Sequence, residues 1–149
     1  MIYLLDTDML IFMIRGLKPG RRESVRTRAA RVMDQCRSAQ AAGNTVGLSA
    51  ITVSEMEFGA QNSADYETEI TAVGNILAPF EIFDYESVAC PAHYGRVRAE
   101  LERRGIPIGS MDLLISAHAL ALEGTLVTND TSHFQRVTGL RTVNWVSES

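Results

Sequence analysis

The stretch Met1-Ile2-Tyr3-Leu4-Leu5-Asp6-Thr7-Asp8 decides how the chain is expected to fold. Its apolar run of β-forming residues is typical of a strand buried on both faces of a parallel sheet. Two carboxylates, separated by one threonine, follow the run directly. Ligands of open α/β sheets bind beyond the carboxyl ends of the strands, so Asp6 is expected at the edge where such a fold carries its chemistry.

Strand-like and helix-like patterns alternate along the rest of the chain. Further strands are expected over 45–48, 80–83, 125–128 and 140–143, and helices over 9–16, 23–42, 49–59, 65–77, 86–104 and 111–122, with a helical turn around 133–134. Strands separated by helices predict a three-layer α/β/α fold around a central parallel sheet of four to five strands. The length predicts one domain over residues 1–149.

Short polar residues before several of these segments predict helix caps. Asp8 is expected to cap the helix over 9–16, and Ser110 the helix over 111–122. The three histidines, His93, His118 and His133, share no metal-ligand spacing, so each is expected to have a structural role.

Composition predicts a soluble cytoplasmic protein. The hydrophobic content is 46% and the charged content 21%, both ordinary for a globular chain. No apolar run approaches the roughly 18 residues of a membrane span, and no basic segment precedes the first apolar run as in a signal peptide. Cys36 and Cys90 lack metal-ligand spacing and are expected to be reduced.

Charge is distributed unevenly along the chain. The net charge of −4 argues against a globally basic nucleic-acid binder. Eight of the 14 basic residues nevertheless lie between Arg15 and Arg37, opposed only by Glu23 and Asp34. Such a cluster is either a solvated helix face or a landing site for phosphates. In the second case the residues expected to bind a phosphate backbone are Arg15, Arg21, Arg22, Arg26 and Arg28.

Four acids occupy positions that should converge. Asp6 ends the first strand, Asp130 follows the fourth, and Glu55 and Asp112 lie in the first turns of helices. Strand ends and the helix starts that follow them lie at the same edge of such a sheet. Four carboxylates there would repel one another unless a hard divalent cation such as Mg²⁺ or Mn²⁺ bound them.

Each acid also has a structural interpretation. Asp112 suits the positive end of a helix dipole, Asp130 suits a turn with Asn129, and Glu55 suits a solvent-facing helix position. Asp6 is hardest to explain in this way, because a carboxylate beside a buried strand needs a partner. The joint placement of the four acids, rather than any one of them, predicts the metal site.

Four short motifs follow one another in a recognisable order. They are Leu4-Leu5-Asp6-Thr7-Asp8, Ser54-Glu55-Met56-Glu57-Phe58-Gly59, Met111-Asp112-Leu113-Leu114-Ile115-Ser116-Ala117-His118-Ala119-Leu120 and Leu126-Val127-Thr128-Asn129-Asp130. Together they resemble a PIN domain, closest to the VapC-type toxins of prokaryotic toxin–antitoxin pairs, over Met1 to Trp145. The chain departs from the family in having Asp at position 8 instead of Asn, Ser at position 110 instead of Pro, and a longer, more basic segment over 19–45.

The resemblance implies a Mg²⁺-dependent endoribonuclease, with Mn²⁺ as a possible substitute. Carried over by position, Asp6 and Asp112 are direct metal ligands, while Glu55 and Asp130 bind a second ion or hold the water of the first. The hydroxyls of Thr7 and Thr128 would support the metal ligands without contacting the ion. Asp8 would be an auxiliary acid or a helix cap.

The same resemblance implies particular partners. The expected substrate is structured RNA such as tRNA, cut in a single-stranded loop whose bases are accessible. A cognate VapB-like antitoxin is expected to cover the acidic pocket with a peptide segment and a positive group. A homodimer is also expected, with DNA contacted only through the antitoxin and no contact with a membrane.

Two other functions compete with this interpretation. Asp6-Thr7-Asp8 also fits a haloacid-dehalogenase-like phosphohydrolase, but that family needs a lysine well downstream, and the sole lysine here is Lys18. The second alternative is not an enzyme but a binding module, whose acids would bind only the arginines of a partner protein.

Overall fold

The first strand, β1 (Ile2–Leu5), is the central strand of a five-stranded parallel sheet with the order β3-β2-β1-β4-β5. The computed structural model describes residues 1–147. The other strands are β2 (Thr45–Ser49), β3 (Glu81–Phe83), β4 (Thr125–Val127) and β5 (Arg141–Val143). Leu5 pairs in register with Leu48 of β2 on one side and with Val127 of β4 on the other. The expected parallel sheet is therefore confirmed, with its full complement of five strands.

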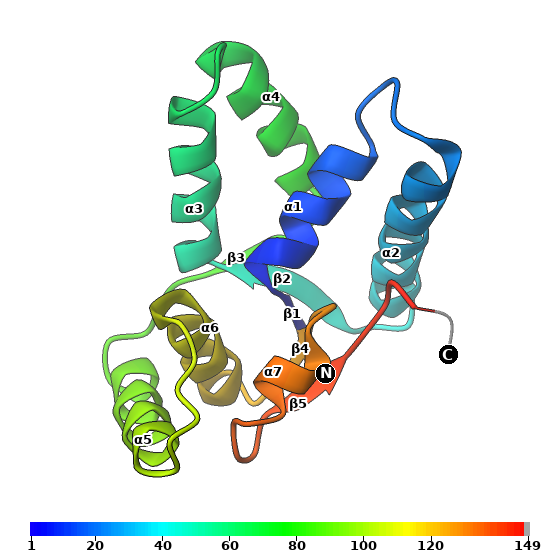
Figure 1. Ribbon diagram of the computed structural model, residues 1–149. Helices are drawn as coiled ribbons and strands as arrows, with labels where there is room; N and C mark the ends of the chain where they lie inside the picture. The colour runs from blue at the N-terminus through cyan, green and yellow to red at the C-terminus, as the bar shows by residue number, and fades with distance from the viewer. Residues whose placement is uncertain (148–149) are drawn as a thin grey trace.

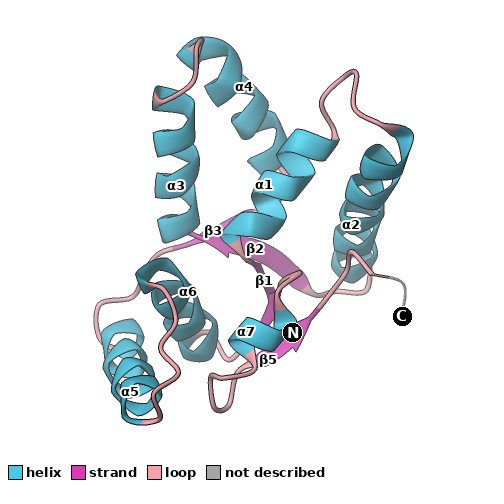
Figure 2. Ribbon diagram, viewed as in Figure 1, coloured by secondary structure: helices cyan, strands magenta, loops and turns pink. Residues whose placement is uncertain are grey.

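Helices cover both faces of this sheet (Figures 1 and 2). They are α1 (Thr7–Gly16), α2 (Glu23–Ala41), α3 (Ala50–Gln61), α4 (Tyr66–Leu77), α5 (Ala89–Arg103), α6 (Ser110–Ala121) and α7 (Thr131–Phe134). Figure 1 shows α1 to α4 on one side of the sheet and α5 and α6 on the other. This is the three-layer α/β/α arrangement that the alternation of patterns predicts. No helix within the described range 1–147 is long and apolar enough to cross a membrane.

The alternation of side chains along β1 explains the two layers. Leu5 is fully buried in the larger core with Leu10 and Met13 of α1 and Val32 of α2. Its neighbour Leu4 points to the other face, where it packs in a separate core with residues of α6 and β4. A strand buried on both faces reads as a continuous apolar run, as the sequence of β1 does.

Two expected helix caps are wrong. The carboxylate of Asp6, not of Asp8, accepts the hydrogen bond at the start of α1, from the backbone N–H of Met9 at 2.6 Å. Extended backbone angles at Asp6 make it the capping residue, and Asp8 falls inside the first turn. Ser110 is likewise the first residue of α6, preceded by Gly109, and its side chain makes no capping bond.

The order of the strands creates a switch point beside β1. The chain passes from β1 through β2 to β3 on one side, and then crosses to β4 and β5 on the other. Helices that follow β1 and β4 therefore diverge and leave a crevice beyond the ends of these strands. Asp6 follows β1 directly, and Asp130 comes three residues after the end of β4.

The helices α1 and α2 meet closely at Gly16. The backbone of Gly16 lies so near α2 that a Cβ atom at this position would be 2.5 Å from the Cβ of Ala29. Contact at this distance is repulsive, so only glycine lets the two helices pack as they do. This packing fixes the arginine-rich start of α2 relative to α1.

We expect Gly16→Ala to lower the free energy of unfolding by about 1–3 kcal/mol, because α2 must move to admit the methyl group. Urea denaturation measures the change. The matched control is Gly95→Ala in α5, where a Cβ meets no atom within 4 Å. That substitution should raise stability by up to about 1 kcal/mol, since alanine is the better helix former. Equal effects at both positions would contradict the close packing of α1 on α2.

Candidate active site

Asp6 lies at the end of the central strand and is almost completely buried. Only 4% of the residue is exposed. Its backbone N–H donates to the carbonyl of Val127 at 3.0 Å, which continues the pairing of β1 with β4 by one residue. Its carboxylate caps α1 and accepts a hydrogen bond from the hydroxyl of Thr128. The fold thus holds this carboxylate in a fixed position at the switch point.

Four carboxylates line one cavity at this edge of the sheet. The cavity has a volume of about 210 Å³. Its acids are Asp6, Asp8, Glu55 and Asp112, and its apolar wall consists of Ile11, Met111 and Ile115. The structure therefore brings together three of the four acids that the sequence predicts to converge, and adds Asp8. Within residues 1–147, Glu55 has neither a hydrogen-bond nor an ion-pair partner.

Burial and mutual repulsion raise the pKa values of two of these acids. Desolvation raises the pKa of Asp6 from 3.8 to about 6, opposed by hydrogen bonds from Thr128 and Met9, with Asp8 and Asp112 adding repulsion. Burial also raises the pKa of Asp112, which His133 lowers while other acids raise it further. Burial is thus the main cause of both shifts, and the neighbouring carboxylates add to it.

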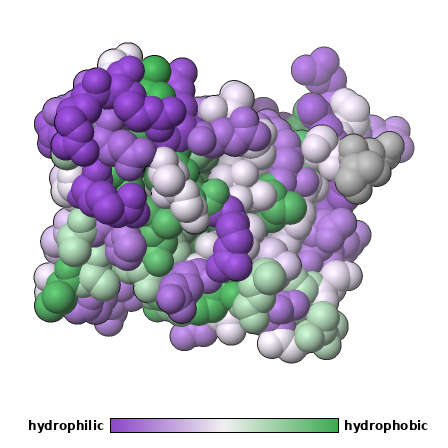
Figure 3. Space-filling view, turned by 90° about the horizontal axis from the view of Figure 1, so that it is seen from below, coloured by the Kyte–Doolittle hydropathy of each residue, from purple (hydrophilic) through white to green (hydrophobic). Residues whose placement is uncertain are grey.

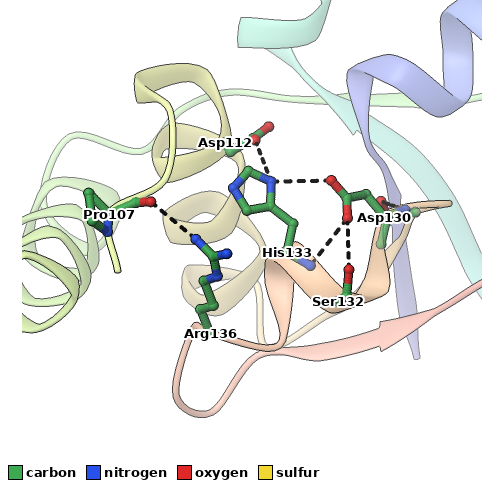
Figure 4. Close-up of polar contacts among 7 residues, drawn as sticks. Pro107, Asp112, Asp130, Ser132, His133 and Arg136 are labelled. Carbon is green, nitrogen blue, oxygen red and sulfur yellow. Dashed lines mark hydrogen bonds and ion pairs between the residues drawn. The ribbon is translucent and has the colours of Figure 1, made fainter. Parts of the chain in front are cut away.

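Asp130 lies beside the cavity and is joined to it by a histidine. The Nδ1 atom of His133 lies 3.2 Å from a carboxylate oxygen of Asp130 and 3.3 Å from one of Asp112 (Figure 4). Asp130 also caps α7 by accepting a hydrogen bond from the backbone N–H of His133 at 3.2 Å. The ring of His133 therefore lies between two of the acids that the sequence predicts to converge, a position that the sequence analysis did not predict. Its three-residue spacing from Asp130, at the start of a helical turn, is the sequence feature that could have revealed it.

Two threonines connect the acids to the surrounding elements. The hydroxyl of Thr128 hydrogen-bonds to the carboxylate of Asp6 and accepts from the backbone N–H of Asp130 at 3.0 Å. The hydroxyl of Thr7 lies 2.9 Å from that of Thr52, so it ties the start of α1 to α3. Thr128 therefore couples two acids directly, whereas Thr7 positions the helices that carry them.

The donor set has the chemistry that a hard divalent cation requires. Its ligands would be carboxylate oxygens, and repulsion from neighbouring acids raises the pKa values of Asp6 and Asp112. In the described part of the chain, however, no three His, Cys, Asp or Glu side chains form a group that could hold a metal ion as they stand. The carboxylates line a common cavity without surrounding a common point, so an ion would have to draw them inward.

The five arginines expected to bind RNA are exposed and have no carboxylate partner within residues 1–147. Other members of the basic cluster are engaged: Lys18 pairs with Glu69 at 2.9 Å and Arg37 with Asp34 at 3.3 Å. On α5 and just beyond it, Arg96, Arg98 and Arg104 are also paired with carboxylates. Figure 3 shows hydrophilic side chains gathered at the end of the molecule where α5 lies, and there Arg98 pairs with Glu102 at 3.0 Å. Unpaired positive charge is thus concentrated along α1 and α2.

Comparison with known proteins agrees with this geometry. Residues 3–140 match the PIN domain family. The chain is 33% identical to Ribonuclease VapC2 of Rickettsia felis over 145 residues, which is 97% of this chain and 98% of that protein. It is 31% identical to the tRNA(fMet)-specific endonuclease VapC of Shigella flexneri over 143 residues, 96% of this chain and 97% of that protein.

Solved structures give the same result. A chain of the crystal structure of VapBC2 from Rickettsia felis, bound to a DNA fragment from their promoter, superposes with a TM-score of 0.82 at 32% identity. The match covers 97% of this chain and 99% of that one. DNA-bound VapBC from Salmonella typhimurium superposes with a TM-score of 0.81 at 28% identity, over 97% of this chain and 98% of that one. The chain therefore belongs to the PIN-domain family, and within it to the VapC-type ribonucleases.

Proposed function

We propose that this chain is an endoribonuclease toxin that requires a divalent cation, Mg²⁺ or Mn²⁺, and cuts structured RNA in a single-stranded loop. The observation that carries the proposal is the cavity at the switch point, which four carboxylates line together and no lysine or arginine lines. The tRNA(fMet)-specific relative, at 31% identity over nearly the whole chain, supports tRNA as the substrate class.

The acids divide by their placement. Asp6 and Asp112, which repel each other across the cavity, are proposed to hold the cation directly. Glu55, without a partner of its own, and Asp130, tethered through His133, are proposed to hold a second ion or to orient the attacking water. When bound, the cation would supply the charge that lowers the pKa of water and stabilises the leaving oxygen. Thr128 keeps the Asp6 carboxylate in place, and Asp8 adds a further negative charge at the mouth of the cavity.

The unpaired arginines are proposed to hold the RNA backbone beside the cavity. A phosphodiester approaching four carboxylates is repelled, and the exposed side chains of α1 and α2 offset this repulsion. Since these arginines have no acidic partner within residues 1–147, binding a phosphate breaks no salt bridge.

A VapB-like antitoxin is the proposed partner, because the compared structures are VapBC complexes. An antitoxin segment carrying a positive group would suit the uncompensated acids of the cavity. Contact with DNA is proposed only through that antitoxin, and two copies of this chain are proposed to form a homodimer.

The alternatives are not favoured. A haloacid-dehalogenase-like phosphohydrolase needs a lysine beside its acids, but Lys18 is paired with Glu69 and does not line the acid cavity. A binding module without catalytic activity is not favoured either, since the chain belongs to a family of ribonucleases.

We expect Asp6→Asn and Asp112→Asn each to lower RNA cleavage by about 100-fold or more, because each removes charge that stabilises the cation. Sequencing of RNA ends after expression in cells measures cleavage and identifies the cut site together. Asp34→Asn, on the exposed surface of α2, is the matched control and should cleave normally. Equal cleavage by all four proteins would indicate a contaminating ribonuclease and contradict the proposal.

Without metal, stability should fall as the pH rises. The pKa of Asp6 is about 6 in the folded chain against an ordinary 3.8, so the folded state binds more protons than the unfolded state between these values. The free energy of unfolding should therefore decrease between pH 4 and 6, by at most about 3 kcal/mol. Urea denaturation in EDTA across this range measures the slope.

Adding Mg²⁺ at pH 7.5 should restore this stability, since bound cations stabilise the folded state by mass action. The Asp6→Asn variant should show neither the decrease in unfolding free energy between pH 4 and 6 nor the stabilisation by Mg²⁺. The same Mg²⁺ response in wild type and Asp6→Asn would place the ion elsewhere.

Reversing Arg21, Arg22, Arg26 and Arg28 to glutamate should weaken RNA binding and flatten its dependence on salt. For single strands the logarithmic salt slope changes by about 0.7 per phosphate contact, so four lost contacts remove about 3. Fluorescence anisotropy at several salt concentrations measures this slope. Arg103→Glu is the matched control for the single change Arg26→Glu. Arg103 is also exposed and unpaired in the described chain, but it lies on α5. An unchanged slope in the quadruple variant would remove the arginines from the RNA-binding surface.

A further inference from the structure

A groove runs along α1 away from the acid cavity, and the proposed reaction does not use it. We call it the α1 groove; it is lined by Asp8, Ile11, Phe12, Arg15, Gly16, Arg21 and Val25. Asp8 and Ile11 also line the acid cavity. The two hollows therefore adjoin, and a ligand in one reaches the other without leaving the surface.

The wall of the groove is a single face of one helix. Asp8, Ile11, Phe12 and Arg15 follow one another at the three- and four-residue spacings that place side chains on one side of a helix. Since a helix rises 1.5 Å per residue, Asp8 and Arg15 are about 10 Å apart along its axis. The groove is thus acidic where it meets the cavity and basic at its far end.

Phe12 forms a flat apolar surface in the middle of this face. The residue is half-buried and packs against the large core, which restrains its ring. The guanidinium carbon of Arg28, from α2, lies 6.0 Å from the centre of the ring. Arg28 thus lies over the Phe12 ring, while Arg15 and Arg21 line the same groove as Phe12. None of the three arginines has an acidic partner within residues 1–147.

This combination matches the chemistry of a nucleotide. Unpaired bases stack on aromatic rings and on guanidinium planes, and their phosphates pair with arginine. A base inside a duplex cannot present its face in this way, so the groove suits only an unpaired nucleotide. An acidic peptide would satisfy the arginines but leave the ring and guanidinium without a stacking partner.

We propose that the α1 groove binds one unpaired nucleotide next to the bond that is cut, with its base stacked on Phe12 and its phosphate held by Arg15 and Arg21. The proposal rests on the proposed ribonuclease function, and it adds a reason for selecting single-stranded loops. The groove also fixes the direction in which the strand leaves the cavity, along α1 toward the start of α2.

The test compares the effect of removing the Phe12 ring from the protein with the effect of removing one base from the RNA. Phe12→Leu keeps an apolar side chain against the core but removes the flat face. The probe is a mixed-sequence, single-stranded RNA whose cut site with the wild-type protein has been mapped, together with copies carrying one abasic position each. Affinities are measured by fluorescence anisotropy in EDTA, which prevents metal-dependent cleavage.

We expect Phe12→Leu to weaken binding of the intact RNA about ten-fold, the usual size of one lost stack. One abasic position beside the cut should weaken wild-type binding to the same extent, and should cost nothing further in Phe12→Leu. Phe12→Tyr, which keeps the ring, should restore the sensitivity to that position. Tyr94→Leu, on α5, removes an aromatic ring on the other side of the sheet and should bind as wild type does.

The outcomes separate the two proposals. If the wild-type protein cleaves RNA but Phe12→Leu binds intact RNA with wild-type affinity, the α1 groove is not a nucleotide site and the ribonuclease proposal stands. If the affinity lost through Phe12→Leu adds to the affinity lost at every abasic position, the proposed stacking on Phe12 is likewise overturned. If the wild-type protein cuts no RNA but shows the non-additive loss on a panel of abasic single strands, the ribonuclease proposal fails and the groove stands. Absence of any RNA binding overturns both.

Discussion

The burial of one carboxylate at the end of the central strand is the constraint on which the rest of the site depends. Asp6 is 4% exposed, and desolvation raises its pKa to about 6. It cannot move away, because its backbone continues the β1–β4 pairing and its side chain caps α1. A fold that only needed a helix cap could use a neutral serine or asparagine here. A buried charge here instead suits the proposed cation, which would offset the cost of burying the carboxylate.

The other acids are arranged around this fixed point with decreasing restraint. Thr128 links Asp6 to the backbone of Asp130, and His133 links Asp130 to Asp112, so these three acids form one connected network. Glu55 stands outside it, on α3, without a partner in the described chain. Because α3 is held to α1 by the Thr7–Thr52 contact, Glu55 is positioned by its helix rather than by bonds of its own. Glu55 is therefore the least restrained of the four carboxylates.

Sequence patterns were sufficient for the fold and for the meeting of Asp6, Glu55 and Asp112 at one cavity. Both follow from local periodicity and from the rule that strand ends share an edge. Sequence patterns failed where the answer depends on contacts between distant elements. Asp8 looks like a better cap than Asp6 until the exact end of β1 is known. His133 looks isolated until α7 is placed against α6, which brings its ring within 3.3 Å of Asp112. The stacking of Arg28 on Phe12 is set by the crossing of α1 and α2 at Gly16, which no spacing in the sequence reveals.

The dipole of α1 stabilises both the acidic residues at its start and the arginine at its end. Asp6 and Asp8 lie at its start, where the helix dipole is positive and stabilises carboxylates, and Arg15 lies in its last turn, where the dipole is negative and stabilises a cation. Reversing this order would place each charge at the unfavourable end of the helix. The same polarity suits the proposed function, in which an RNA backbone would lie along the arginines and a cation would be held by the acids at the bond to be cut. In that proposal one helix keeps the binding of the strand and the chemistry about 10 Å apart.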